Sequence, residues 1–318
     1  MQLDIVPFAE RVCQKKLGVQ HVIVMKDDEL CAKFDFEPTD RRSEIHSATK
    51  SVVSMAVGIA IGENLFDLDT HPVEVLSRYL PEDYDRAWDT VTVRDLLTMR
   101  SGHNHKLMDG YSLIPGVENR DDLENQEWVN YIFSQPLQVK PGILFIYNNA
   151  CPHILARMIV ELTGENLIDW LRKRLFDPLE IHNPQWGTDP KGYTCGPGGL
   201  QLTTREYARI AQLCLHLGNW NGKQLVPKAY MEEALAKQTE TASEGEKAGT
   251  SDLTSGYGYF FWNARRDHAS FLYGWGGQMG IILPEQKATV TIKSYEFDTQ
   301  ALMDAVWETI VPQLKSTI

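Results

Sequence analysis

The chain has 318 residues, 43% of them apolar, and a formal charge of -12 from 31 basic and 43 acidic side chains. This length and composition suffice for a substantial core, in one large or two intimately packed domains. No basic block is long enough to follow a phosphate backbone, so we expect no nucleic-acid partner. The longest apolar stretch, around residues 52–61, is far shorter than the ~20 residues that span a bilayer, so we expect no membrane segment.

The first seventeen residues, MQLDIVPFAERVCQKKL, mix charged and apolar positions and predict an amphipathic helix, not a signal peptide. Five cysteines show no CxxC spacing, and their odd number cannot pair completely. We expect them to be reduced core residues: Cys13, Cys31, Cys151, Cys195 and Cys214. The lack of an export signal and of a disulfide pattern predicts a cytoplasmic protein.

After the N-terminal helix we predict a hairpin, because two short apolar runs in residues 20–36 flank a polar turn. From Ser47 to Asn64 a wide apolar face predicts a long buried helix. The polar segment 240–256 predicts an exposed linker or mobile loop. Helical patterns dominate the region between them, at Val93–Arg100, Cys151–Leu162, Leu167–Leu175, Thr204–Leu217 and Pro227–Leu235.

Four strands and a helix are predicted at the end of the chain: strands at Gly256–Asn263, Ala269–Tyr273, Gln278–Leu283 and Ala288–Ser294, and a helix at Thr299–Val311. Both ends of the chain therefore supply a helix and strands. We predict an α/β (α+β) fold with one antiparallel sheet from both termini, flanked by helices, at 1–45 and 256–318. A mostly helical lobe at 46–255 is inserted into it, and the cleft between the lobes is the expected site.

Ser47 and Lys50 form an S-x-x-K sequence where the buried helix begins. Helical spacing places Lys50 within reach of the Ser47 hydroxyl. The free backbone N–H groups and the positive end of the helix favour an oxyanion at a carbonyl attacked by Ser47. A desolvated lysine can accept the proton of the serine. S-x-x-K arises by chance about once in such a chain, so a capping serine followed by a solvated lysine is the alternative.

Tyr147 and Asn149 lie just before a predicted helix and can point the same way from an extended segment or a tight turn. The phenol could then hold the Ser47 proton, and the amide could bind a substrate amide or Lys50. Taken singly, the two residues are better explained as a loop aromatic and a helix N-cap, and it is their occurrence together with S-x-x-K that favours a function.

A glycine-rich sequence, Tyr273-Gly274-Trp275-Gly276-Gly277-Gln278, opens a predicted strand. Glycines in a strand allow a ligand or another backbone to come close. A backbone N–H here could join that of Ser47 in a two-donor oxyanion hole. A turn between two strands explains the same residues without a function.

In this order, the three sequences resemble the signature elements of the serine β-lactamase and penicillin-binding-protein superfamily. The class C branch, with its esterase and 6-aminohexanoate-dimer hydrolase relatives, is the most similar. Segments such as VRDLLTMRSGH and PGILFIYNNA extend the resemblance across residues 44–312. It implies a hydrolase that forms an acyl-enzyme with a small-molecule ester, amide or β-lactam-like substrate and needs no cofactor.

The resemblance also implies a role for each motif residue. Ser47 would be the acylated nucleophile, with Lys50 and Tyr147 as its general acid/base partners. Asn149 would belong to the substrate-binding network. The backbone N–H groups of Ser47 and Trp275 would form the oxyanion hole.

One departure from the family concerns the third element, which usually begins Lys-Thr-Gly or His-x-Gly. This chain has Leu272-Tyr273-Gly274, without the cation that binds a substrate carboxylate. Lys247-Ala248-Gly249 matches only in spelling, because no strand follows it. We therefore expect an esterase or small-amide hydrolase, with Tyr273 and Trp275 shaping an aromatic pocket. A non-catalytic or slowly acylated penicillin-binding or sensor-type module is the alternative.

His103-Asn104-His105, with Asp109 nearby, suggests a metallohydrolase, since H-x-H can place two imidazoles on one metal. A metallo-β-lactamase-like site would need aspartate and histidine at positions 107 and 108, which hold leucine and methionine. We expect no metal here and instead a loop that lines the cleft.

Overall fold

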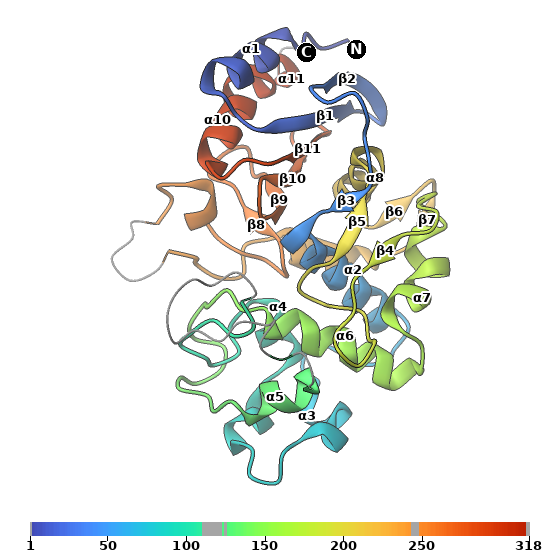
Figure 1. Cartoon of the computed structure of the whole chain (residues 1–318), viewed down its shortest axis with the longest axis vertical. Helices are drawn as coiled ribbons and strands as arrows, with labels where there is room; N and C mark the ends of the chain where they lie inside the picture. Colours follow the sequence, from blue (N-terminus) through green and yellow to red (C-terminus); the bar gives the residue numbers. More distant parts are fainter. Residues whose placement is uncertain (1, 110–122, 124–125, 243–247, 316–318) are drawn as a thin grey trace.

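The central feature of the computed structural model is a six-stranded antiparallel sheet in the order β2-β1-β11-β10-β9-β8 (Figure 1). The structure describes residues 2–109, 123, 126–242 and 248–315. The strands are β1 (Val19–Lys26), β2 (Glu29–Asp35), β8 (Trp262–Asn263), β9 (Ser270–Gly274), β10 (Gln278–Leu283) and β11 (Ala288–Ser294). Because β1 pairs with β11, the predicted sheet from both ends of the chain is confirmed.

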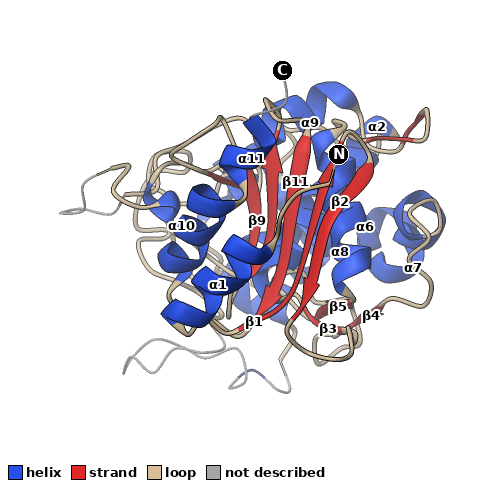
Figure 2. Cartoon of the chain, turned by 90° about the horizontal axis from the view of Figure 1, so that it is seen from above, coloured by secondary structure: helices blue, strands red, loops and turns tan. Residues whose placement is uncertain are grey.

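Helices cover both faces of this sheet (Figure 2). The terminal helices α1 (Val6–Lys15), α10 (Thr299–Thr309) and α11 (Val311–Lys315) pack on one face. Helix α8 (Thr204–Leu215) packs on the other, against β1, β10 and β11. Every residue of β10 and β11 is buried between these layers. The sequence of β10 is mostly apolar, whereas β11 alternates apolar residues with the buried polar residues Thr289, Thr291 and Lys293.

A mostly helical region surrounds α2 (Thr49–Gly62), in which every residue from 49 to 60 is buried, and α6 (Ala150–Thr163) packs against it. The predicted helices are confirmed with shorter bounds, except that α6 is one residue longer at each end than predicted. The helices α3 and α5 and the short strands were not predicted. The lobe boundaries at 46 and 255 stay a prediction. The other elements are α3 (Pro72–Val75), α4 (Val93–Leu97), α5 (Trp128–Ser134), α7 (Leu167–Leu171), α9 (Lys228–Leu235), the sheet β3 (Ser43–Glu44), β5 (Leu200–Leu202), β4 (Gln185–Trp186) and the hairpin β6 (Asn219–Trp220), β7 (Lys223–Gln224).

The strand predicted at Gly256–Asn263 is wrong except for its last two residues, which form β8. Phe260 has a φ of +61°, which a strand does not accommodate. The N–H of Phe260 donates to Leu97 O, and its carbonyl accepts from Ser51 Oγ. Phe260 is therefore hydrogen-bonded to two helices and not to a neighbouring strand. The aromatic residues that suggested a strand therefore fill the core of the helical region.

The polar segment 240–256 is not a simple exposed linker. Asp252 is 1% exposed, and its carboxylate accepts hydrogen bonds from Arg265 N, Gln300 Nε2 and Trp307 Nε1. These contacts fix the end of the segment to α10. Lys247, the alternative source of a Lys-x-Gly sequence, lies outside the described residues.

Four of the five cysteines are buried as predicted, whereas Cys13 is exposed on α1, and none of the five forms a disulfide bond within the described residues. Helix α1 presents Cys13 on its solvent side because its buried positions are Phe8, Ala9 and Val12. In the part of the chain that the structure describes, we find no helix with the length and apolar content needed to cross a bilayer.

Lys293 of β11 is buried at the junction between the central sheet and the small sheet of β3 and β5. Its ammonium donates to three backbone carbonyls, those of Leu202 at 2.6 Å, Ser43 at 3.3 Å and Arg41 at 3.4 Å. Burial lowers the pKa of Lys293 to about 8, although Asp40 and Glu206 partly oppose the shift. The folded protein thus carries a buried cation that unfolding would return to water.

This burial predicts a measurable pH dependence of stability. Below pH 8, Lys293 is charged in both states, and the cost of burying the charge is fully present. Between pH 8 and about 10.4, the unfolded chain keeps the proton that the folded chain has lost, so stability rises with pH. We expect the unfolding free energy of wild type minus that of Lys293→Met to increase by about 2–3 kcal/mol from pH 7 to pH 10. Denaturant titrations at several pH values measure this difference.

Lys228→Met is the matched control, because Lys228 is 65% exposed in an ion pair with Glu232. The difference in unfolding free energy between wild type and Lys228→Met should stay constant from pH 7 to pH 10. A constant difference for Lys293→Met as well would show that Lys293 titrates normally.

Candidate active site

Ser47 and Lys50 are brought together where the 3₁₀ helix η1 (His46–Ala48) runs into α2. The Nζ atom of Lys50 lies 2.9 Å from Ser47 Oγ, and it donates a second hydrogen bond of 2.9 Å to the carbonyl of Pro197. Lys50 is 1% exposed. The lysine is therefore not a solvated surface side chain but a buried partner of the serine hydroxyl.

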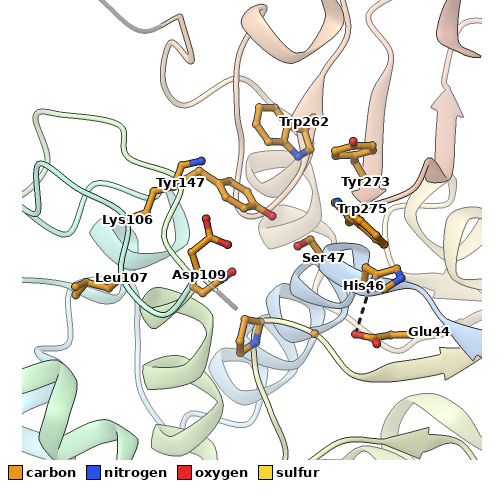
Figure 3. Close-up of a pocket in the computed structure, with 13 residues that line it drawn as sticks. Glu44, His46, Ser47, Lys106, Leu107, Asp109, Tyr147, Trp262, Tyr273 and Trp275 are labelled. Atoms are coloured by element: carbon orange, nitrogen blue, oxygen red, sulfur yellow. Dashed lines mark ion pairs between the residues drawn. The ribbon is translucent and has the colours of Figure 1, made fainter. Parts of the chain in front are cut away.

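Tyr147 lies on the extended segment before α6, and its hydroxyl points toward Ser47 (Figure 3). The phenol is hydrogen-bonded to the Ser47 side chain, and Lys50 Nζ lies 4.8 Å from the centre of its ring. The ring stacks on Trp262 with centroids 5.6 Å apart. Burial raises the pKa of Tyr147 well above its usual value, and the hydrogen bond from Ser47 offsets only part of the shift. The phenol is thus protonated at neutral pH.

Asn149 presents a buried polar atom at the site. Its Nδ2 donates to the carbonyl of Met108 at 3.0 Å, whereas its buried Oδ1 has no hydrogen-bond partner among the described residues. The capping role belongs to the preceding residue, because Asn148 Oδ1 accepts from Ala150 N. A buried acceptor without a partner costs free energy unless a ligand donates to it.

Gly274, the last residue of β9, lies directly against the backbone that carries Ser47. A Cβ atom here would lie 2.0 Å from Ile45 O and 3.2 Å from Ala48 N. Only glycine therefore allows β9 to approach the nucleophile turn so closely. Trp275 is the next residue, and its indole ring packs edge-on against the His46 ring, with centroids 5.4 Å apart.

These residues surround a cavity of about 410 Å³ (Figure 3). Of the predicted residues, Ser47, Tyr147, Asn149, Tyr273 and Trp275 line it. Lys50 lies behind the lining and contacts Ser47, Tyr147 and Pro197, which all line the cavity. Gly274 lies beside the η1 backbone. The structure thus gathers all seven predicted residues at one place.

Eight further lining residues were not predicted as site residues: Glu44, His46, Lys106, Leu107, Asp109, Pro197, Gly198 and Trp262. Glu44 accepts the N–H of Gly199 at 2.8 Å, and its carboxylate lies 3.6 Å from His46 Nδ1. Burial lowers the pKa of His46, although Glu44 opposes the shift. The adjacency of Glu44 and His46 to Ser47 was their only signal in the sequence.

The His103–His105 segment contributes to the cavity differently from a metal site. His103 is buried, its Nδ1 lies 3.0 Å from Ser101 Oγ, and burial lowers its pKa to about 4. Within the described ranges, no group of three or more His, Cys, Asp or Glu side chains is placed to hold a metal ion. The same loop instead contributes Lys106 and Asp109 to the cavity wall.

An antiparallel sheet covered by helices, with a serine, lysine and tyrosine cluster beside its edge, defines the fold of β-lactamases and transpeptidases. The family model described as Beta-lactamase matches residues 22–310, and the chain belongs to this family. A putative 6-aminohexanoate-dimer hydrolase from Bacillus anthracis has a similar structure, with a TM-score of 0.77 and 20% identity. That match covers 95% of this chain and 80% of the other, and it shows the fold alone.

Two curated relatives are similar in sequence. The 6-aminohexanoate-dimer hydrolase of Paenarthrobacter ureafaciens is 26% identical over 237 residues, which are 70% of this chain and 59% of the relative. The lovastatin esterase of Penicillium rubens is 26% identical over 154 residues, which are 44% of this chain and 38% of the relative. The chain therefore spans less than two thirds of the length of either relative.

Proposed function

We propose that this protein is a serine hydrolase that cleaves an ester or a small amide through an acyl-Ser47 intermediate. The observation that carries the proposal is the 2.9 Å contact between Lys50 Nζ and Ser47 Oγ at the wall of a cavity. A serine hydroxyl is a weak nucleophile unless a base removes its proton, and this lysine is placed to do so. Relatives named as a hydrolase and an esterase support the same chemistry.

In the proposed reaction, Ser47 Oγ attacks the substrate carbonyl while the neutral form of Lys50 takes its proton. The backbone N–H groups of Ser47 and Trp275 stabilise the oxyanion, a contribution of about 3–4 kcal/mol per donor in comparable sites. Tyr147, which is protonated at neutral pH, relays a proton to the leaving group and regains one from Lys50. Water then attacks the acyl carbon and releases the acid.

The third sequence element argues for an ester or small amide over a β-lactam. Leu272, which replaces the usual lysine, is fully buried and contacts the core at Gly280. Tyr273 lines the cavity, but its hydroxyl is hydrogen-bonded to Thr299 Oγ1 at 2.8 Å. Strand β9 thus offers no cation to a carboxylate, and we propose that β-lactam turnover is inefficient.

A fluorophosphonate probe tests the nucleophile directly. We expect intact-mass spectrometry to show one adduct per chain, mapped to Ser47 by peptide digestion, together with turnover of p-nitrophenyl acetate. Ser47→Ala should lose both, with an unchanged unfolding transition.

A separate incubation with penicillin distinguishes the proposed hydrolase from the alternative, a penicillin-binding or sensor-type module. A lasting penicillin adduct on Ser47 without ester turnover would favour a penicillin-binding or sensor-type module. An adduct at another residue, or none with any probe, would refute the acyl-Ser47 mechanism.

A further inference from the structure

Three aromatic side chains form an exposed group at the edge of the cavity. Trp275 is 38% exposed, Tyr295 62% and Phe297 56%. The Trp275 ring lies 4.8 Å from Phe297 and 5.8 Å from Tyr295, and the last two rings are 5.0 Å apart. We call these three residues the aromatic platform. Mutual contact among three large rings that all remain exposed is unusual for a surface with only a structural role.

The backbone beneath the platform is firmly held. The N–H of Tyr295 donates to Gly18 O at 2.7 Å, and the N–H of Glu296 donates to Gly276 O at 2.9 Å. The Glu296 carboxylate accepts from the N–H groups of Gly18 and Phe297. A Cβ atom at Gly18 would lie 2.1 Å from Tyr295 O, so the residue that precedes β1 packs closely against this segment. The rings are thus held on a fixed segment before any ligand arrives, which reduces the entropy that binding would cost.

Trp275 belongs to both the platform and the catalytic cavity. Its side chain lines the cavity that contains Ser47, and its ring packs on Phe297 outside that cavity. Apolar surface therefore continues from the acylation site to the protein exterior. The cavity has a volume of about 410 Å³, and a substrate group too long for it can extend from Ser47 past Trp275 onto the platform.

We propose that the aromatic platform is an outer substrate subsite, which binds a long alkyl or aromatic group of the ester or amide that Ser47 attacks. The inference rests on the proposed function and narrows its substrate class to molecules with an extended apolar group. Burying successive methylene groups against the three rings provides the selectivity, because each buried CH₂ improves binding about fourfold.

The test compares p-nitrophenyl acetate with p-nitrophenyl octanoate, and ethyl acetate with octyl acetate, so that the acyl and alcohol sides are probed separately. Wild type should show a higher kcat/KM for the longer substrate in at least one pair. Phe297→Ser and Tyr295→Ser should each reduce that preference about fivefold to tenfold. Leu30→Ala, which removes a 54% exposed side chain from β2, is the matched control and should keep the wild-type preference.

A binding measurement separates this inference from the proposed mechanism. In the Ser47→Ala background, calorimetric titration should show tighter binding of the longer substrate in at least one pair, and Phe297→Ser should reduce the difference about fivefold to tenfold. Equal affinity for the short and long substrates of both pairs would overturn the subsite, whether or not wild type turns over esters. Chain-length-dependent binding without any Ser47 adduct would instead uphold the subsite and refute the acyl-Ser47 mechanism.

Discussion

Replacing Lys50 with methionine is expected to lower kcat/KM for p-nitrophenyl esters by about 10²–10⁴-fold. The methionine fills much of the same volume, but it can neither take the Ser47 proton across 2.9 Å nor donate to Pro197 O. The rate of fluorophosphonate labelling should fall with it, because both reactions need the activated hydroxyl. Replacing a 1% exposed amine by an apolar side chain of similar volume should leave the unfolding free energy within about 2 kcal/mol of wild type.

Two comparisons make this result specific. Lys228→Met removes an exposed lysine and should retain wild-type kcat/KM. If Lys50→Met also hydrolysed the esters at the wild-type rate, Lys50 would be excluded as the base, and His46, the other basic side chain beside Ser47, would become the candidate.

Replacing Gly274 with alanine is expected to reduce kcat/KM at least about 100-fold, although the residue carries no reacting atom. The added Cβ would fall 2.0 Å from Ile45 O, and neither backbone can accept it without moving. The end of β9 must then separate from η1, which moves the N–H of Trp275 away from the carbonyl bound at Ser47. The same overpacking should lower the unfolding free energy by about 1–3 kcal/mol.

Steady-state kinetics and denaturant titration measure the two effects separately. Gly187→Ala is the matched control, since the nearest atom to its new Cβ would be Gly199 Cα at an ordinary 3.7 Å. Wild-type activity in Gly274→Ala would show that the close approach of β9 and η1 is not needed for catalysis.

The parts of the site that could be predicted from the sequence depend on short-range geometry. Ser47 and Lys50 lie within one helical turn, so their spacing alone indicates contact. The position of Tyr147 beside them follows from no local rule, and the resemblance to a family indicated it. The sheet was predictable because β9, β10 and β11 are rich in β-branched, aromatic and other apolar residues.

The rest depends on tertiary structure. Lys106 and Asp109 reach the cavity from an irregular loop, where no periodicity tells which side chains face inward. Trp262 stacks on Tyr147 at the end of a segment whose aromatic residues imitate a strand, but Phe260 and its neighbours pack among helices. No pattern in the sequence singled out Tyr295 and Phe297. They become candidate substrate contacts only because their rings touch Trp275, which lines the cavity.

The pairing of β1 with β11 affects the order in which the molecule is assembled. Val19 lies opposite Ser294, so the ladder joins residues from the two ends of the chain. Contacts of such long sequence separation form late, because they close a very large loop. When residues 1–270 have been synthesised, the nascent chain contains Ser47, Lys50 and Tyr147, but not Trp275 or the strands β10 and β11. On the proposed mechanism, the nascent chain would at that point hold the nucleophile without its oxyanion donor, and we expect Ser47 to be unreactive until the last strands have been synthesised.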